Sequence, residues 1–151
     1  MGRRAVAPIA GLAMVIGLIL ANPAVAQGRP LSTTLTGAAE APGPGDPDAS
    51  GFASIALNQG QREVCFDLGW ENIDGTVTAS HIHVAPPGTP GPVVVPLFVD
   101  QSFPGTGTAS GCLGGVDEEL IKAIRQDPAA YYVNIHSTVF PAGAIRGQLG
   151  K

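Results

Sequence analysis

All three histidines of the chain lie in two short segments that resemble each other. The first, SHIHVAPPGTPGP at 80–92, carries His81 and His83, and the second, VNIHSTVFPAGAIRG at 133–147, carries His136. In each segment an Ile-His pair precedes a loop rich in proline and glycine. Three imidazoles suffice to hold Zn²⁺ or Cu²⁺ with an open fourth position, and an H-x-H pair with one distant histidine can supply them. The pattern therefore indicates a candidate mononuclear metal site.

Strand periodicity predicts which side chains accompany these histidines. In a strand, residues i and i+2 share a face and lie about 6.6 to 6.8 Å apart. His81 and His83 therefore point the same way, as do Asn134 and His136. With a matching register in the last strand, the predicted polar face consists of His81, His83, Asn134, His136 and Arg146. The opposite, apolar face consists of Ile82, Val84, Val133, Ile135 and Ile145.

Two interpretations of the polar face stay open. The weak internal repeat predicts two hairpin-like units that place the histidines at comparable heights, where they could surround an ion. Alternatively, the imidazoles hydrogen-bond loop carbonyls and one another, and they hold the loops without a metal. Arg146 bears on the choice, because a fixed positive charge among the histidines would oppose a dication. Ring nitrogens that converge on one point favour the metal, and nitrogens turned onto carbonyls favour the network.

Other candidate chemistry has simpler explanations. Ser80 and Ser137 adjoin histidines but point to the opposite faces of their strands, and the chain has no G-x-S-x-G motif, so a serine hydrolase is not expected. Asp46 and Asp48 lack the spacing of a calcium loop and are expected to be solvated loop acids. Three aromatic side chains are expected in the core rather than on a ligand platform: Trp70, Tyr131 and Tyr132.

The elements that must position these residues are short and β-rich, because 21 glycines and 14 prolines interrupt the chain. The clearest strand is REVCFDLGW at 62–70, in which apolar residues from Val64 to Trp70 alternate with polar or small ones. Six other ranges are strand candidates: 31–37, 52–58, 77–84, 92–98, 130–137 and 143–149. The expected count is about eight strands.

One segment, VDEELIKAIRQDP at 116–128, has the pattern of a helix instead. Asp117 can cap it, acids occupy its first turn, and Ile121 and Ile124 share an apolar face. We expect one short helix near 118–126. Many short strands without regularly alternating helices predict an all-β fold, namely an antiparallel Greek-key-like β-sandwich of about eight strands, with a small barrel as the runner-up.

The N-terminus has the organisation of an export signal. An arginine pair precedes a mostly apolar run at 5–21, and Ala24-Val25-Ala26 offers a cleavage site. The run is short for a bilayer span, so residues 1–26 are predicted to be a cleaved signal peptide, with no stable membrane insertion afterwards. The mature chain, 27–151, is then one domain that is secreted to the extracellular or periplasmic space.

Charge and cysteines limit the partners and the compartment. The mature chain keeps six basic and twelve acidic side chains, a net charge of −6 with neutral histidines, so nucleic acid and anionic membranes are not expected partners. Cys65 and Cys112, 47 residues apart, predict one disulfide in an exported protein. By loop entropy such a bridge contributes about 4 kcal/mol. Two unpaired structural thiols remain the alternative.

These segments resemble the CHRD domain, the module named after chordin and found in many exported bacterial proteins. The resemblance spans residues 31–149 and rests on LTGAAEAP, SGFASIAL, VCFDL, SHIHVAPPGTPGPVVVPLF and PAAYYVNIHSTVFPAGAIRGQL. It implies that 27–151 is a single extracellular β-rich domain without a well-established catalytic activity, and a cysteine pair placed like Cys65 and Cys112 is common in bacterial members.

A more distant likeness is to Cu,Zn superoxide dismutase, which needs more histidines than this chain has, so that activity is not expected. The sequence thus predicts an exported, non-enzymatic structural or binding module whose partner is a protein or a glycan at the cell surface. It requires no cofactor. The alternative is a mononuclear copper- or zinc-binding protein that uses His81, His83 and His136.

Overall fold

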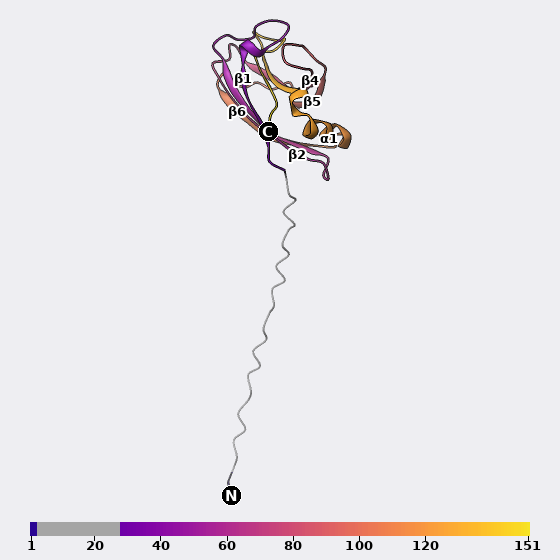
Figure 1. Cartoon of the computed structure of the whole chain (residues 1–151). Helices are drawn as coiled ribbons and strands as arrows, with labels where there is room; N and C mark the ends of the chain where they lie inside the picture. The colour runs from indigo at the N-terminus through magenta and orange to yellow at the C-terminus, as the bar shows by residue number, and fades with distance from the viewer. Residues whose placement is uncertain (3–27) are drawn as a thin grey trace.

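A computed structural model describes residues 1–2 and 28–151 of the chain (Figure 1). The predicted signal peptide, residues 1–26, lies outside the described residues except for its first two positions. No helix among the described residues is long and apolar enough to cross a membrane.

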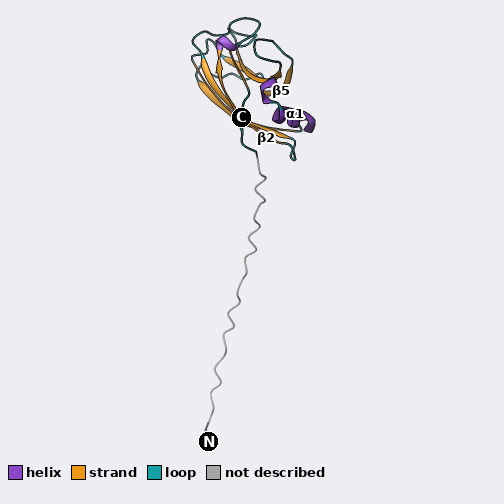
Figure 2. Ribbon diagram, in the orientation of Figure 1, coloured by secondary structure: helices purple, strands orange, loops and turns teal. Residues whose placement is uncertain are grey.

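The described chain is mainly β-structure with one α-helix (Figure 2). In chain order the elements are β1 (Leu31–Thr36), β2 (Ser50–Asn58), β3 (Glu63–Glu71), β4 (Val77–Val84), β5 (Val93–Phe98), β6 (Gly107–Gly114), α1 (Glu118–Gln126), β7 (Tyr131–Ser137) and β8 (Ile145–Gln148). Two short 3-10 turns, at Gly37–Ala39 and Pro128–Ala130, complete the list. The all-β prediction with one short helix is confirmed.

The eight strands form one antiparallel sheet in the order β5-β4-β7-β8-β1-β2-β3-β6. The sheet curls around a single core until its two edges approach each other. Phe98 on edge strand β5 lies with its ring centroid 6.4 Å from that of Phe66 on β3, and 6.3 Å from that of Trp70. Opposite parts of one nearly closed sheet therefore pack face to face, as the two layers of a sandwich do.

Alternation along the strands determines the core. On β3, Val64, Phe66, Leu68 and Trp70 are all at most 9% exposed, as the sequence pattern predicts. The apolar set predicted beside the histidines also points inward: Ile82, Val133, Ile135 and Ile145 are fully buried, and Val84 is partly buried against the core. The polar residues between them therefore lie on the outer face of the sheet.

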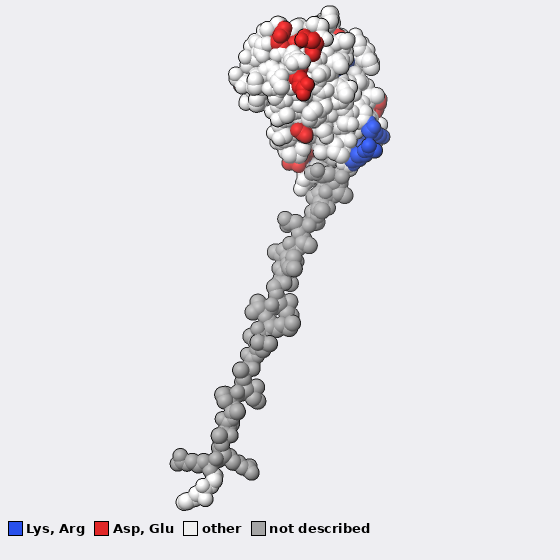
Figure 3. Space-filling model, turned by 90° about the vertical axis from the view of Figure 1, so that its left-hand side faces the viewer, with Lys and Arg blue, Asp and Glu red and all other residues white. Residues whose placement is uncertain are grey.

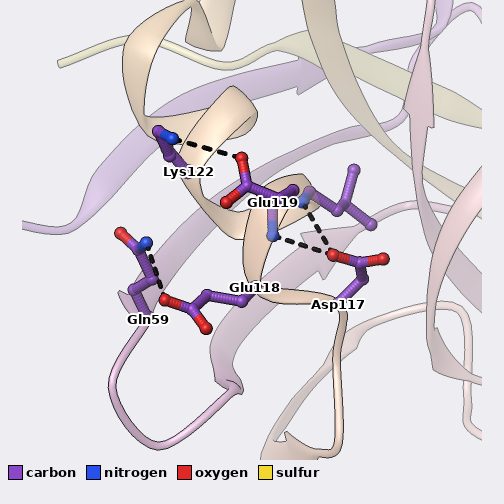
Figure 4. Close-up of polar contacts among 6 residues, drawn as sticks. Gln59, Asp117, Glu118, Glu119 and Lys122 are labelled. Atoms are coloured by element: carbon purple, nitrogen blue, oxygen red, sulfur yellow. Dashed lines mark hydrogen bonds and ion pairs between the residues drawn. The ribbon is translucent and has the colours of Figure 1, made fainter.

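Helix α1 begins where the sequence predicts. The Asp117 carboxylate accepts hydrogen bonds from the backbone N–H groups of Glu119 at 2.8 Å and Leu120 at 3.4 Å (Figure 4). Such a cap satisfies donors that the first helical turn leaves unpaired. Ile121 and Ile124 are fully buried against the core, so the helix closes one end of the curled sheet.

Strand β6 is the element that the sequence analysis did not locate. Its sequence, GTASGCLG, contains three glycines and little β-propensity. It nevertheless pairs with β3 at eight successive positions, and the predicted disulfide joins the facing residues Cys65 and Cys112. A non-local partner and a covalent bond thus hold a strand whose own sequence favours one weakly.

Candidate functional site

The three histidines lie on two neighbouring strands. Strand β4 carries His81 and His83, and it pairs antiparallel with β7, which carries His136. In this register His81 faces Asn134 and His83 faces Tyr132. The two strands are therefore neighbours, and the sheet itself brings the rings together.

The rings converge on one another. The Nδ1 atom of His81 lies 3.1 Å from Nε2 of His136, and one nitrogen from each of His81, His83 and His136 lies within 4.8 Å of the other two. A metal about 2 Å from each of its ligand nitrogens keeps them within about 4 Å of one another. In a tetrahedral site the separation is about 3.3 Å, which His81 and His136 already have, so the third nitrogen would need to approach by up to about 1.5 Å to complete the site.

Backbone carbonyls orient two of the rings. Nδ1 of His83 lies 2.8 Å from the Gly91 carbonyl oxygen, and Nδ1 of His136 lies 3.1 Å from that of Pro141. A carbonyl oxygen only accepts, so Nδ1 carries the proton in both rings, and a neutral ring then presents the lone pair of Nε2. Metal-binding histidines are commonly oriented in this way, with the second ring nitrogen bonded to a carbonyl or carboxylate.

The Nε2 atoms also have neighbours within the protein. Nε2 of His136 accepts from Nδ1–H of His81, and Nε2 of His83 lies 3.1 Å from Oδ1 of Asn134. An amide oxygen and the Nε2 lone pair of a neutral His83 both accept, so the two groups form a hydrogen bond when the Asn134 amide is turned over and its NH₂ group donates to Nε2. The cluster is thus a closed hydrogen-bond network, and a metal ion would compete with Asn134 and His81 for two lone pairs.

The electrostatic environment keeps the rings neutral. The pKa of His81 is lowered to about 4, mainly by burial and in addition by the neighbouring His136 and His83. Burial likewise lowers the pKa of His83 and of His136, although their hydrogen bonds to carbonyls oppose the shift. Neutral imidazole is the form that binds a metal, so no proton has to leave at neutral pH.

Arg146 shares the polar face but lies outside the histidine cluster. It is 1% exposed, and its guanidinium donates to the carbonyl oxygens of Thr89 at 2.8 Å and Pro86 at 3.0 Å. Its Cζ lies 3.4 Å from the centroid of the Tyr132 ring, whereas His83 stacks on the same ring at 4.7 Å and 6°. Two groups cannot occupy one face of a ring, so Tyr132 separates Arg146 from His83.

Tyr132 is the site residue that the sequence analysis assigned to the wrong surroundings. It is 3% exposed, as expected of a core aromatic, but it lies on the polar face between His83 and Arg146. Its hydroxyl also accepts from the backbone N–H of Gly91 at 3.2 Å. The signal was available in the sequence, because Tyr132, Asn134 and His136 are spaced two apart on one strand.

Other polar side chains near the cluster also donate hydrogen bonds to backbone carbonyl oxygens. The side-chain amide of Gln148 donates to the Ala85 carbonyl oxygen at 2.7 Å and to that of Ala129 at 2.8 Å. Ser80 and Ser137 donate to the carbonyl oxygens of Asn134 and Asp74 rather than to a histidine. These hydroxyls therefore support the backbone, and they form no serine–histidine pair.

One prediction for the loop acids was wrong. Asp46 is 0% exposed rather than solvated, and its Oδ2 accepts from the backbone N–H of Asp74 at 2.7 Å. A side chain that bridges two loops is buried by tertiary packing, which local sequence does not encode. Asp48 is exposed, as predicted.

A second group of metal-binding residue types, Glu63 with Cys65 and Cys112, contains the disulfide. Metals bind the thiolate form of cysteine, so the bridge removes these ligands from use.

The comparisons with known proteins apply to nearly the whole described fold. The family model of the CHRD domain matches residues 31–149, which include all eight strands and the histidine cluster. No curated protein and no solved structure matches the chain.

Proposed function

The chain belongs to the CHRD-domain family, and we propose that it is an exported, non-enzymatic binding domain whose histidine cluster captures one Cu²⁺ or Zn²⁺ ion. The ligands are His81, His83 and His136. A disulfide between Cys65 and Cys112 supports the exported location, because such bonds persist in oxidising compartments.

The observation that carries the proposal is the orientation of His83 and His136. Each ring gives its Nδ1–H to a backbone carbonyl, so Nε2 carries the lone pair in both rings. That of His136 faces His81, and that of His83 faces Asn134. A network that served the loops alone would need only the carbonyl contacts. Here the same contacts also select the tautomer in which Nε2 is the ligand atom, as carbonyl groups commonly do for metal-binding histidines.

Access and charge also suit an ion. His81 and His136 are half-buried at the edge of the cluster, so an ion can reach them from solvent. The positive charge of Arg146 is held on the far side of Tyr132 by two loop carbonyls, which removes it from the position where it would oppose a dication most. Three neutral imidazoles leave a coordination position open for water or for a partner's side chain.

The test is a calorimetric titration of the chelator-treated protein with Cu²⁺ and, separately, with Zn²⁺. We expect one ion per chain. His81→Ala is the preferred variant, because the one polar contact described for the His81 side chain is with His136, so the fold loses little. Loss of an outer contact to a metal ligand costs about 10- to 100-fold in affinity, and loss of a ligand should cost about 100-fold or more.

Ser54→Ala on β2, in the other half of the sheet, is the matched control and should bind like the wild type. A bound ion should also raise the melting temperature of the wild type and not that of His81→Ala. The proposal fails if neither ion binds stoichiometrically, or if His81→Ala binds as tightly as the wild type. The histidines would then be a structural network.

A further inference from the structure

The outer face of the other half of the sheet is open to solvent. We call this the bare face and define it as the outward side chains of β1, β2, β3 and β6. Hydroxyl groups dominate it, and those that are exposed include Ser32, Thr34, Ser50, Thr108 and Ser110. Water can satisfy such groups, so the bare face can exchange water for a ligand.

One large apolar side chain interrupts this polar surface. Phe52 on β2 is 46% exposed, and it is opposite Thr34 on β1 and Gly69 on β3. A Cβ atom added to Gly69 would lie only 2.2 Å from Cε1 of Phe52. The absence of a side chain at Gly69 therefore lets the ring lie down on the sheet, with one face against the backbone and the other toward solvent.

A shallow cleft of about 430 Å³ adjoins the ring. Its lining includes Phe52, Ser50, Glu71, Thr106 and Thr108, with glycine backbone between them. Trp70 contributes from beneath, where it is 2% exposed and donates its Nε1–H to the Pro104 carbonyl oxygen. The volume is within the usual range for small-ligand sites.

The charge of the cleft limits what can bind there. Glu71 is the one charged residue that lines it, and no lysine or arginine does. Figure 3 shows the side on which Figure 1 places β1 and β6; its described surface is mostly uncharged, with scattered carboxylates and one basic cluster at its lower right edge. Phosphate, sulfate and uronate groups would therefore meet no counter-charge. An apolar peptide would find too little apolar surface beyond one ring.

We infer that the Phe52 cleft binds a neutral glycan, with one pyranose ring stacked on the exposed face of Phe52. The axial C–H groups of a pyranose form an apolar patch that matches a flat aromatic ring, and its hydroxyls match the surrounding donors and acceptors. Ser50 and Thr108 flank the ring, and the Glu71 carboxylate can accept from two vicinal hydroxyls. This site is independent of the histidine cluster, which lies over β4 and β7.

The test is affinity electrophoresis and calorimetry of the purified protein with neutral oligosaccharides built from glucose, mannose, xylose and N-acetylglucosamine. Oligouronates serve as the anionic comparison. We expect binding to at least one neutral series and none to the uronates. Phe52→Ala should weaken binding at least 10-fold, and Phe52→Trp should retain it. Because Phe52 is half-exposed, both variants should keep the fold, which thermal unfolding would verify.

Val139→Ala is the matched control, since Val139 is an apolar side chain 55% exposed at another place on the surface. It should bind like the wild type. The inference is overturned if no neutral oligosaccharide binds, or if Phe52→Ala binds as well as the wild type. It is also overturned if sedimentation shows a dimer that Phe52→Ala dissociates, because the ring would then be a contact between copies of the chain.

Discussion

The two halves of this sheet differ in how far their outer faces are covered by loops. Over β4, β7 and β8, which we call the covered face, loops close over the outward side chains, and Asn134 and Arg146 are only 2% and 1% exposed. On the bare face, outward side chains such as Thr108 and Ser110 remain exposed. Both regions obey the same alternation of inward apolar and outward polar residues, so the loops make the difference.

The loops that cover the face change where its polar side chains find hydrogen-bond partners. Under the loops, water no longer satisfies donors and acceptors, and each group has to find a protein partner at a definite angle. That requirement produces the arrangement in which carbonyls orient the imidazoles and receive the guanidinium. The covered face is therefore pre-organised for a small ion, whereas the bare face suits a ligand that replaces water one hydroxyl at a time.

The largest effect is expected from Arg146→Met. The change removes hydrogen bonds to Thr89 and Pro86 and the contact with Tyr132, and it leaves two covered carbonyls unpaired. Bonds from a charged donor contribute about 1.5 to 3 kcal/mol each, so we expect the free energy of unfolding to fall by about 3 to 5 kcal/mol in urea titrations. A loss below about 1 kcal/mol would show that the loops stay over the face without the hydrogen bonds from Arg146.

The disulfide should give the next largest effect, and on the bare face. Replacing both Cys65 and Cys112 by alanine should cost about 2 to 4 kcal/mol, because the bridge closes a loop of 47 residues in the unfolded chain. Edge strand β6 pairs with β3 alone, so its amides should lose protection from hydrogen exchange more than those of β4. Equal loss of protection in the two strands would contradict this view of β6.

Sequence alone predicted the parts of this comparison that depend on local periodicity. The i, i+2 spacing placed His81 and His83 on one face, with Ile82 on the other, because a strand offers no alternative. The start of the helix at Asp117 was also predictable, because a capping side chain bonds to backbone groups only two and three residues away. Strand β6 was missed because its glycines carry no pattern and its partner, β3, is distant along the chain.

The covering of a face is what the sequence could not predict. Asp46 and Glu40 lie in a segment rich in proline and glycine that resembles any solvated loop, yet Asp46 is fully buried and Oε1 of Glu40 is buried without a hydrogen-bond partner. Their environment is created by the loop that follows β7, which reaches them at Gly143 and Ala144. Only tertiary packing determines such contacts.

Glu40 gives a pH-dependent test of this packing. Burial against Gly143 raises the pKa of its carboxyl to about 7, although Arg146 and the Ala41 backbone oppose the shift. A folded pKa above the ordinary value of 4.5 means that the contribution of Glu40 to stability is full below pH 4.5 and is lost as the pH rises to 7. Glu40→Gln has no such dependence.

The variant should therefore gain stability over the wild type by up to about 2 kcal/mol between pH 5 and pH 8, measured by urea unfolding. Glu71→Gln on the bare face is the matched control, because Glu71 is exposed. Parallel pH profiles for Glu40→Gln and the wild type would mean that water reaches Glu40 and that this loop does not cover it.

The smallest effect is expected on the bare face itself. Ser110 on β6 lies opposite Asp67 on β3, and both side chains are exposed. Ser110→Ala removes a hydroxyl that water satisfies equally in the folded and unfolded states, so the free energy of unfolding should change by less than about 0.5 kcal/mol. Urea unfolding at neutral pH measures the change. A loss above about 1 kcal/mol would mean that the hydroxyls of the bare face form a bonded network of their own, and a glycan would then have to break that network rather than displace water.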